Sequence, residues 1–216
     1  MEVFKNNRID GEIIIVDDSS SDGTFEFLNE QKFFIPSLKV IFRKLPASIS
    51  RAWYEGFEAA NKKIIVCIDA DLCHNPDCFP GMLEKMNEFD IVIGSRYLNN
   101  PVNVMEGKSR FAVFLSVCGH FITRSVIGFK EFDTSHSFRM FKKDIFNAIK
   151  GKLKNKGNTF LIEFLYYAKK NGAKVTEIPI KYGKRVYGST KLKVSREGLR
   201  YICFIVKMFF KRVFSL

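Results

Sequence analysis

Residues 64–76 of this 216-residue chain read IIVCIDADLCHNP. The first five residues are apolar and mostly β-branched, which predicts a strand buried on both faces. Asp69-Ala70-Asp71 follows that strand directly, and an Asn-Pro pair then forces a turn. Because open α/β sheets bind their ligands at the carboxyl ends of parallel strands, the two carboxylates lie where a ligand is expected.

The spacing of Asp69 and Asp71 is compatible with two chemical roles. Carboxylates one residue apart repel each other unless a cation lies between them, and Mg²⁺ or Mn²⁺ accepts such oxygens together with substrate phosphates. Alternatively, the side chains of a solvated acidic turn satisfy nearby backbone N–H groups. The Asp-x-Asp pattern by itself favours neither interpretation.

Strand and helix patterns alternate along most of the chain. Buried-strand patterns occupy residues 13–16, 38–42, 64–68, 91–93 and 174–180. Helical patterns begin at residue 25 and cover residues 50–61, 79–89, 110–127 and 160–171. This alternation predicts an α/β fold with a mostly parallel sheet and helices on both faces.

The composition is that of one globular domain. Hydrophobic residues make up 46% of the chain, which is long enough for a sizeable core. No apolar run approaches the roughly 18 residues of a membrane-spanning helix, and the N-terminus has no signal-peptide core. The five cysteines form no C-x-x-C pair, so we expect neither a disulfide framework nor a zinc site, in a reducing setting.

Basic charge is concentrated in the last third of the chain. Residues 150–216 carry 17 Lys and Arg against 3 acids (net +14), whereas residues 1–149 carry 18 against 20 (net −2). This asymmetry indicates an anionic surface or substrate. We do not expect a nucleic-acid partner, because the basic residues accompany a continuous apolar face rather than a stacking platform.

Residues 193–216 have the pattern of a basic amphipathic helix. Its two sides carry Lys193, Arg196, Arg200, Lys207 and Lys211 against Ile202, Ile205, Val206, Met208 and Phe209. Such a helix is suited to lying in a membrane interface and is too short and interrupted to span. The alternative is a helix that packs on the domain or on a second copy. We therefore predict a boundary between residues 192 and 193.

Six motifs occur in order over nearly the whole chain. They are IVDDSSSDGT (15–24), DADLCHNP (69–76), GSRY (94–97), DTSHSFR (133–139), EIPI (177–180) and RVYGSTKL (185–192). Together they resemble the inverting family 2 glycosyltransferases, and within that family the dolichol-phosphate mannosyltransferases. The resemblance implies a Rossmann-like GT-A domain over residues 1–192, followed by the membrane-interface helix.

The resemblance also implies an activity. Mannose from GDP-mannose would pass, with inversion, to a polyprenyl or dolichyl phosphate at the cytoplasmic face of a membrane, where the protein is peripheral. Mg²⁺ or Mn²⁺ held by Asp69 and Asp71 would neutralise the leaving nucleoside diphosphate. Another nucleotide sugar or a glycan acceptor is the alternative within the family. A membrane-anchoring subunit or a second copy of the chain are the further partners that we consider.

Residues that the resemblance assigns to the nucleotide sugar are Asp17, Asp18, Asp69, Ala70, Asp71, Arg185 and Lys191. Asp17 or Asp18 would lie near the base, and loop capping is the alternative role for this acidic loop. Arg185 and Lys191 would belong to a lid on the diphosphate, with a solvated basic loop as the alternative.

Residues that the resemblance assigns to catalysis are Asp133, Arg96 and Arg139. Asp133 would act as a base or hydroxyl anchor, and its alternative role is a salt bridge with Arg139. Arg96 and Arg110 would bind the acceptor phosphate, because a guanidinium holds phosphate oxygens in pairs. A surface ion pair is the alternative for both arginines.

Three departures from the family pattern affect the expected site. The first strand and helix of relatives have no counterpart here, and that strand would lie at the middle of the sheet. The chain is then N-terminally truncated, receives the strand from a neighbouring chain, or is a catalytically silent subunit that binds nucleotide or membrane. Cys73 stands where relatives have Ser or Gln, and a thiol is a poor ligand for Mg²⁺. His136 replaces a glycine, which narrows the expected site.

Overall fold

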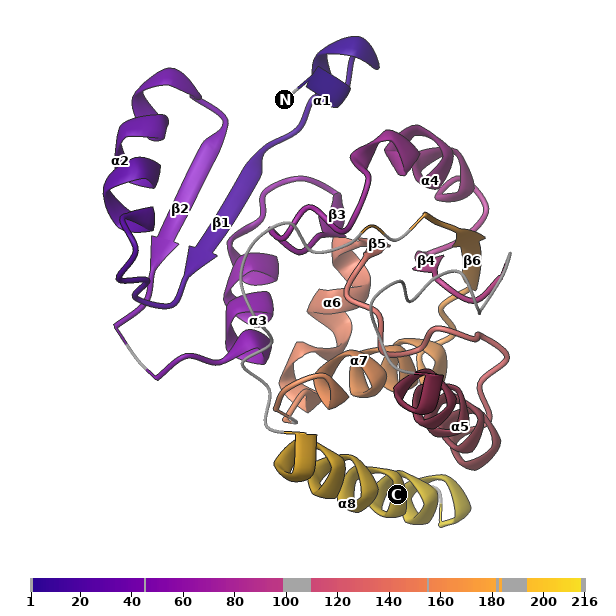
Figure 1. Cartoon of the computed structure of the whole chain (residues 1–216). Coiled ribbons are helices and arrows are strands. Elements are labelled where there is room, and N and C mark those ends of the chain that lie inside the picture. The colour runs from indigo at the N-terminus through magenta and orange to yellow at the C-terminus, as the bar shows by residue number, and fades with distance from the viewer. Residues whose placement is uncertain are drawn as a thin grey trace.

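The computed structural model describes residues 2–44, 46–98, 110–154, 156–181, 183 and 194–214. Its strands are β1 (Ile13–Asp17), β2 (Leu38–Phe42), β3 (Ile64–Cys67), β4 (Ile91–Ser95), β5 (Arg139–Lys142) and β6 (Val175–Pro179). Its helices are α1 (Glu2–Asn6), α2 (Thr24–Phe34), α3 (Ile49–Ala59), α4 (Phe79–Lys85), α5 (Arg110–Ile127), α6 (Lys143–Ile149), α7 (Thr159–Lys170) and α8 (Val194–Val213), with short 3₁₀ turns η1 (Pro76–Cys78) and η3 (Lys150–Lys152). Figure 1 shows their arrangement.

The described strands form two separate sheets. Strands β3, β5, β4 and β6 make a four-stranded sheet in that order, and β1 pairs in parallel with β2. Strand β6 is parallel to β4, whereas β5 is antiparallel to both of its neighbours. Strands β3, β4 and β6 therefore run in one direction, which confirms the α/β class with one reversed strand.

Helix α3 connects the two sheets. Its side chains Trp53 and Phe57 belong to the hydrophobic core of the larger sheet. On another side, a Cβ built at Gly56 would lie 3.3 Å from a methyl group of Val16 in β1, so the glycine permits a close approach. In Figure 1, β1 is the strand of its pair that lies nearer to β3. Neither β1 nor β3 has a second strand partner among the described residues.

The prediction that residues 64–68 are buried on both faces is wrong at its ends. Ile65 and Cys67 are buried, whereas Ile64 and Ile68 are 36% and 41% exposed. Successive side chains of a strand point to opposite faces, and only the face that carries Ile65 and Cys67 is covered here, so exposure alternates along the chain.

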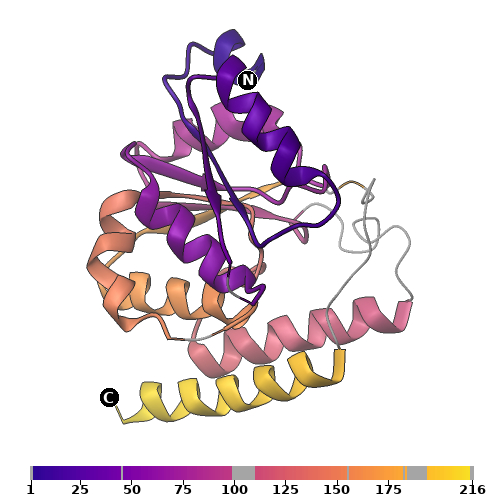
Figure 2. The ribbon, with the colours of Figure 1, turned by 90° about the vertical axis from the view of Figure 1, so that its left-hand side faces the viewer.

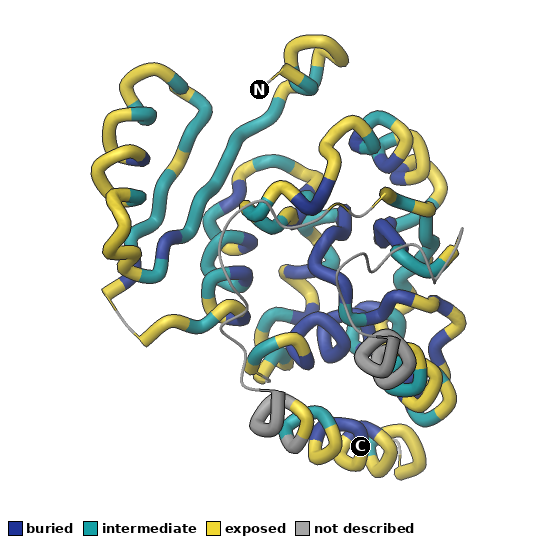
Figure 3. The backbone as a smooth tube through the Cα atoms, viewed as in Figure 1, coloured by how far each residue is buried: buried dark blue, intermediate teal, exposed yellow. Residues whose placement is uncertain are grey.

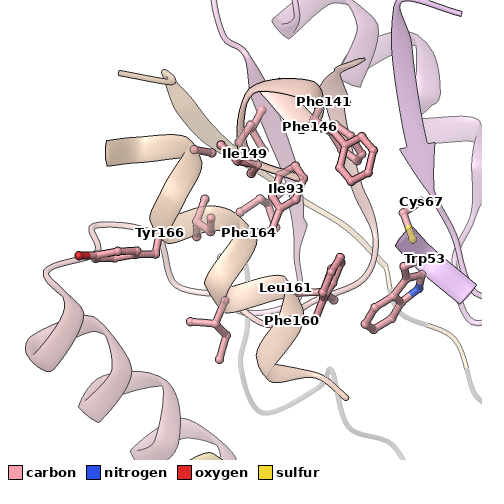
Figure 4. Close-up of a cluster of buried hydrophobic side chains, with 14 of the residues drawn as sticks. Trp53, Cys67, Ile93, Phe141, Phe146, Ile149, Phe160, Leu161, Phe164 and Tyr166 are labelled. Atoms are coloured by element: carbon pink, nitrogen blue, oxygen red, sulfur yellow. The ribbon is translucent and has the colours of Figure 1, made fainter. Parts of the chain in front are cut away.

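The main core is built around α7, shown in Figure 4. Phe160, Leu161, Phe164 and Leu165 are at most 2% exposed, and the ring of Phe141 in β5 lies 4.9 Å from that of Phe164. The buried residues in Figure 3 gather on α7 and on the central strands. Truncating one such aromatic residue costs about 3–5 kcal/mol, so this packing contributes strongly to the stability of the larger sheet.

Helix α8 packs on the rest of the chain beside α5 (Figure 2). Phe204, Ile205 and Met208 are buried in the main core cluster, and the Tyr201 hydroxyl donates to the Gly119 carbonyl at 2.8 Å. A second apolar stripe stays exposed on α8: Ile202, Val206, Phe209, Phe210 and Val213. Both alternatives for the tail thus have structural support, and the boundary at residue 193 stays a prediction. Among the described helices, none is long and apolar enough to cross a membrane.

Helix α1 was not predicted from the sequence pattern. Its residues Val3 and Phe4 pack against the second core cluster, which includes Phe79 and Met82. The Phe4 ring occupies the place where a side chain at position 11 would project, and Gly11 leaves that place open. Since these contacts join residues far apart in the chain, a five-residue helix has no local pattern that predicts it.

Candidate active site

Three loops meet at one edge of the larger sheet. The carboxyl ends of β3 and β4 share an edge because both strands run in the same direction. Strand β5 runs against them, so the loop that precedes it, residues 133–138, lies at the same edge. Arg139, the first residue of β5, is the register partner of both Cys67 and Ile93. The predicted acids and arginines after β3 and β4 are therefore brought together with Asp133.

Asp69 and Asp71 lie on a tight, half-exposed turn after β3. The Ser137 hydroxyl donates to Asp69 Oδ2 at 2.9 Å, and the Cys73 N–H donates to Asp71 Oδ1 at 3.1 Å. Between them Ala70 is exposed, and Leu72 adopts a left-handed φ of 61°. A non-glycine residue in this conformation costs about 1–3 kcal/mol and is characteristic of functional turns.

The donor set of this turn fits a hard divalent cation only in part. Two carboxylates are available, and the described residues contain no cluster of three or more His, Cys, Asp or Glu that could hold a metal ion. Mg²⁺ and Mn²⁺ accept such a site when substrate phosphates supply the remaining ligands. Cys73, whose thiol is a poor ligand for Mg²⁺, is buried, with 2% of its surface exposed. The chemistry of the turn therefore matches a cation that arrives with a diphosphate.

Asp133 and Arg96 form a two-pronged ion pair. Arg96 Nε lies 2.7 Å from Asp133 Oδ2 and Arg96 Nη2 lies 2.8 Å from Oδ1, while the Arg96 backbone N–H also donates to Oδ2. Burial of Asp133 would raise its pKa, but the hydrogen bond and charge of Arg96 outweigh burial and hold the pKa well below its usual range. Asp133 is thus an ionised anchor for Arg96, and the alternative salt bridge with Arg139 does not form.

Arg139 is fully buried and bonds to backbone carbonyls. It donates to the carbonyl oxygens of Thr134 (3.1 Å), His136 (3.0 and 2.6 Å) and Leu161 (3.0 Å). Burial lowers its pKa to about 10, which still leaves it charged at neutral pH. Its side chain therefore fixes the backbone of residues 134–136 from inside the protein, rather than facing the edge where Asp69 lies.

Asp17 and Asp18 are both engaged by the protein itself. Asp17 is buried and accepts from the Ser20 N–H at 3.0 Å and from the Ser20 hydroxyl, which is the loop capping considered above. Asp18 accepts from the Ser48 N–H at 2.6 Å and pairs with Arg43. Arg43 is a residue that sequence reasoning missed, because its position after β2 gives no hint of a partner 25 residues away.

Glu177 and His120 are two further residues near Asp133 that were not predicted as site residues. The Glu177 carboxylate accepts from the backbone N–H groups of Phe132 and Asp133, both at 2.7 Å, and burial raises the pKa of Glu177. His120 Nε2 on α5 lies 3.9 Å from Asp133 Oδ1. Only the EIPI motif pointed to Glu177, and no sequence signal pointed to His120.

Three predicted arginine and lysine residues fall wholly or partly outside the described residues. Arg185 and Lys191 lie in the undescribed range 184–193, and Arg110 is described only as the first residue of α5. The predicted lid segment does begin beside the acidic turn, because the Gly183 N–H donates to the Cys73 carbonyl at 2.9 Å.

Comparison of the chain with protein families identifies its class. The model of the family described as "Glycosyl transferase family 2" matches residues 2–150. The chain belongs to glycosyl transferase family 2. This match includes both acidic turns, the Arg96–Asp133 pair and all of β5.

Three curated relatives share 27–32% identity with the chain. An undecaprenyl-phosphate mannosyltransferase from Micrococcus luteus is 27% identical over 85% of this chain and 76% of its own length. A dolichol-phosphate mannosyltransferase from Pyrococcus furiosus is 32% identical over 91% of this chain but only 55% of its own length. A polyprenol monophosphomannose synthase from Mycolicibacterium smegmatis is 28% identical over 85% and 71%.

Solved structures with a similar fold include two sugar transferases. Glucosyl-3-phosphoglycerate synthase from Mycobacterium tuberculosis, in complex with Mn²⁺, UDP and glucosyl-3-phosphoglycerate, has a TM-score of 0.60 at 14% identity, over 93% of this chain and 69% of its own. A mannosyltransferase from Pyrobaculum calidifontis, in complex with GDP-Man and Mn²⁺, has a TM-score of 0.56 at 16% identity, over 94% and 55%. At these identities the likeness shows the fold, which confirms the GT-A architecture of this family 2 chain.

Proposed function

We propose that this chain is an inverting mannosyltransferase that moves mannose from GDP-mannose to a polyprenyl phosphate at a membrane surface. Family membership supports sugar transfer, and the names of the curated relatives support mannose and a polyprenyl-phosphate acceptor. The observation that carries the proposal is the meeting of the Asp69–Asp71 turn with the Arg96–Asp133 pair at one sheet edge.

The acidic turn would hold the donor. Asp69 and Asp71 would ligate Mg²⁺ or Mn²⁺ together with the donor diphosphate, and such a cation supplies charge neutralisation for the leaving group. The Asp17–Asp18 loop at the end of β1 would lie on the nucleoside side. Arg185 and Lys191 would close over the diphosphate from the segment that begins at Gly183.

The Arg96–Asp133 pair would orient the acceptor. A phosphate monoester is already an anion, so the reaction needs aligned positive charge rather than a strong base. Because Asp133 holds Arg96 through two nitrogens, it fixes the plane of the guanidinium. In this proposal Arg96, with Arg110, binds the acceptor phosphate, and Asp133 and Arg139 act by fixing the position of Arg96 and of the loop before β5.

The exposed stripe of α8 would bring the site to the lipid acceptor. Ile202, Val206 and Phe210 are 62%, 50% and 50% exposed, and Lys207 is exposed beside them. An apolar stripe flanked by basic residues binds an anionic membrane interface through both buried area and charge. We therefore propose a peripheral location at the cytoplasmic face. An anchoring subunit or a second copy of the chain could share the stripe.

A second candidate function is a nucleotide-binding subunit without catalysis. The separation of β1–β2 from the larger sheet favours it, since the Asp17–Asp18 loop and the Asp69–Asp71 turn stand on different sheets. If these two loops are not held rigidly relative to each other, the protein can bind a nucleotide without the alignment of donor and acceptor that sugar transfer requires.

Transfer of radiolabelled mannose from GDP-mannose to a short polyprenyl phosphate tests the proposal. We expect transfer that depends on Mn²⁺ or Mg²⁺ and that falls at least about 100-fold in Asp71→Asn, because removal of one charged ligand weakens the diphosphate site. Asp77→Asn, an exposed acid on η1, is the matched control and should keep full activity. Metal-independent GDP binding without any transfer would favour the non-catalytic subunit, and transfer from UDP-glucose alone would change the assigned donor.

A further inference from the structure

Two buried histidines connect the acidic turn to β4. His74 and His136 are 3% and 5% exposed, and their Nε2 atoms lie 3.1 Å apart. At one end, the Asp69 backbone N–H donates to His74 Nδ1 at 3.1 Å. At the other end, His136 Nδ1 lies 2.6 Å from the carbonyl oxygen of Gly94. These contacts form a continuous hydrogen-bond chain from the end of β3 to the end of β4.

The backbone groups at the two ends determine the tautomer of each ring. The Asp69 N–H can only donate, so His74 Nδ1 is the acceptor and its proton sits on Nε2. The Gly94 carbonyl can only accept, so His136 carries its proton on Nδ1 and leaves Nε2 as an acceptor. The central contact then has one donor and one acceptor, and every bond in the chain points the same way. Each ring therefore keeps one nitrogen without a proton, Nδ1 in His74 and Nε2 in His136, so both rings are neutral in this arrangement.

Packing holds the His74 ring and the backbone of His136 in place, and Asp133 Oδ2 lies 3.8 Å from His136 Nδ1. The His74 ring stacks on Phe138, with centroids 4.9 Å apart and planes 12° apart. Phe138 is itself fully buried, and a Cβ built at Gly94 would lie 2.6 Å from its ring. The carbonyl oxygen of His136 accepts from the buried Arg139 guanidinium. A buried polar group that loses its partner costs about 1–3 kcal/mol, which stabilises this arrangement of bonds.

We propose that His74 and His136 are positioning residues that hold the Asp69–Asp71 turn at a fixed place relative to the Arg96–Asp133 pair. The hydrogen-bonded pair of His74 and His136 is called the histidine relay. The backbone of Asp69 is bonded to this relay, and its side chain is bonded to Ser137, the residue after His136. The backbone and the side chain of Asp69 are therefore both held by the loop that contains His136 and Ser137, the backbone through His74. The statement that the positioned turn binds a metal ion and a diphosphate rests on the proposed function. The relay itself rests on the geometry above.

Imidazole ¹⁵N NMR of the whole protein tests the relay directly. The chain has three histidines, so single substitutions assign every ring signal. We expect opposite neutral tautomers, with the proton on Nε2 in His74 and on Nδ1 in His136. The same tautomer in both rings, or a charged ring at pH 7, would overturn the relay whatever the activity of the protein.

Two substitutions at His136 test whether the relay positions the acidic turn. A Gln side chain can place its amide oxygen near the former Nε2, so His136→Gln keeps an acceptor for His74. An Asn side chain is too short and can replace only the Nδ1 donor to Gly94, so His136→Asn breaks the relay. We expect the affinity for Mn²⁺ in the presence of GDP to fall about 10–100-fold in His136→Asn and less than about 3-fold in His136→Gln.

The control for these substitutions is Lys62→Gln, which removes an exposed ion pair with Asp10. All variants are compared by circular dichroism and thermal unfolding, so that loss of fold is seen separately from loss of binding. If His136→Asn is folded and binds Mn²⁺ with GDP like the wild type, the positioning role is wrong. If the wild type itself fails to bind Mn²⁺ with GDP, the proposed function fails, and the NMR result still decides the relay.

Discussion

At the scale of single residues, the buried Asp133 charge depends on Arg96. Asp133 is fully buried, and removal of one partner from a buried ion pair leaves the other charge uncompensated. We expect Asp133→Asn to lower the free energy of unfolding by about 3 kcal/mol at pH 7, measured by urea denaturation. Asp10→Asn breaks the exposed pair with Lys62 and should cost less than about 1 kcal/mol.

The same pair predicts how this difference changes with pH. Because the pKa of Asp133 is lower in the folded protein than its ordinary value, its stabilising effect is fully present above about pH 4 and is lost as the pH falls further. The gap between wild type and Asp133→Asn should therefore narrow in acid. A gap that is below 1 kcal/mol at pH 7, or that widens in acid, would contradict the assigned ion pair.

At the scale of elements, local patterns predicted the helices and strands well and their partners poorly. The strand at 38–42 and the helix at 110–127 have their predicted bounds, since each has a strong apolar periodicity of its own. The reversed direction of β5 was not predicted, because strand direction is set by packing against β3 and β4.

The residues of the candidate site were likewise predicted in part. Acidic residues next to strand ends were predictable, because the topology of a parallel sheet brings strand ends together. The partners of those acids were not predictable. Arg43 with Asp18, Glu177 with the N–H of Asp133, and His74 with His136 are pairs separated by 25, 44 and 62 residues. Such pairs form only when the whole chain is folded, so local patterns in a single sequence do not predict them.

The β1–β2–α2 unit (residues 13–42) is an element whose stability differs from that of the main sheet. Its strands are mostly half-buried, whereas Ile91, Ile93 and Phe141 in β4 and β5 are fully buried. Two-stranded sheets have little stability of their own. We expect amides of β1 and β2 to exchange hydrogen at least about 10-fold faster than those of β4 and β5, measured by NMR or mass spectrometry. Equal protection in both sheets would show that α3 couples them into one unit.

At the scale of the whole molecule, the last third of the chain combines a net positive charge with exposed apolar side chains on α8. The net charge of residues 150–216 is +14, and α8 has its apolar stripe exposed. Both features favour contact with anionic lipid, and the charge contribution weakens with salt. Phe33 and Phe34 on α2 are also exposed, at 83% and 78%, in a part of the chain with little net charge.

We expect Phe210→Glu to weaken sedimentation with vesicles of anionic lipid at least about 5-fold, because it places a negative charge in the apolar stripe. Phe33→Glu introduces the same charge on α2 and should leave vesicle binding unchanged. Raising NaCl should weaken binding of the wild type as well. If the two variants bind alike, or if salt has no effect, α8 is not the surface that meets the lipid.

The separation of the two sheets has a consequence for solution behaviour. On the side away from their sheet partners, β1 and β3 each present a row of N–H and C=O groups with no strand beside it in the described part of the chain. Residues 13–16 and 64–66 are uncharged, isoleucine-rich and free of proline, which is the composition that favours aggregation through backbone pairing. At high protein concentration, copies of the chain should therefore associate first through these two strand edges, by backbone hydrogen bonds between strands of different copies.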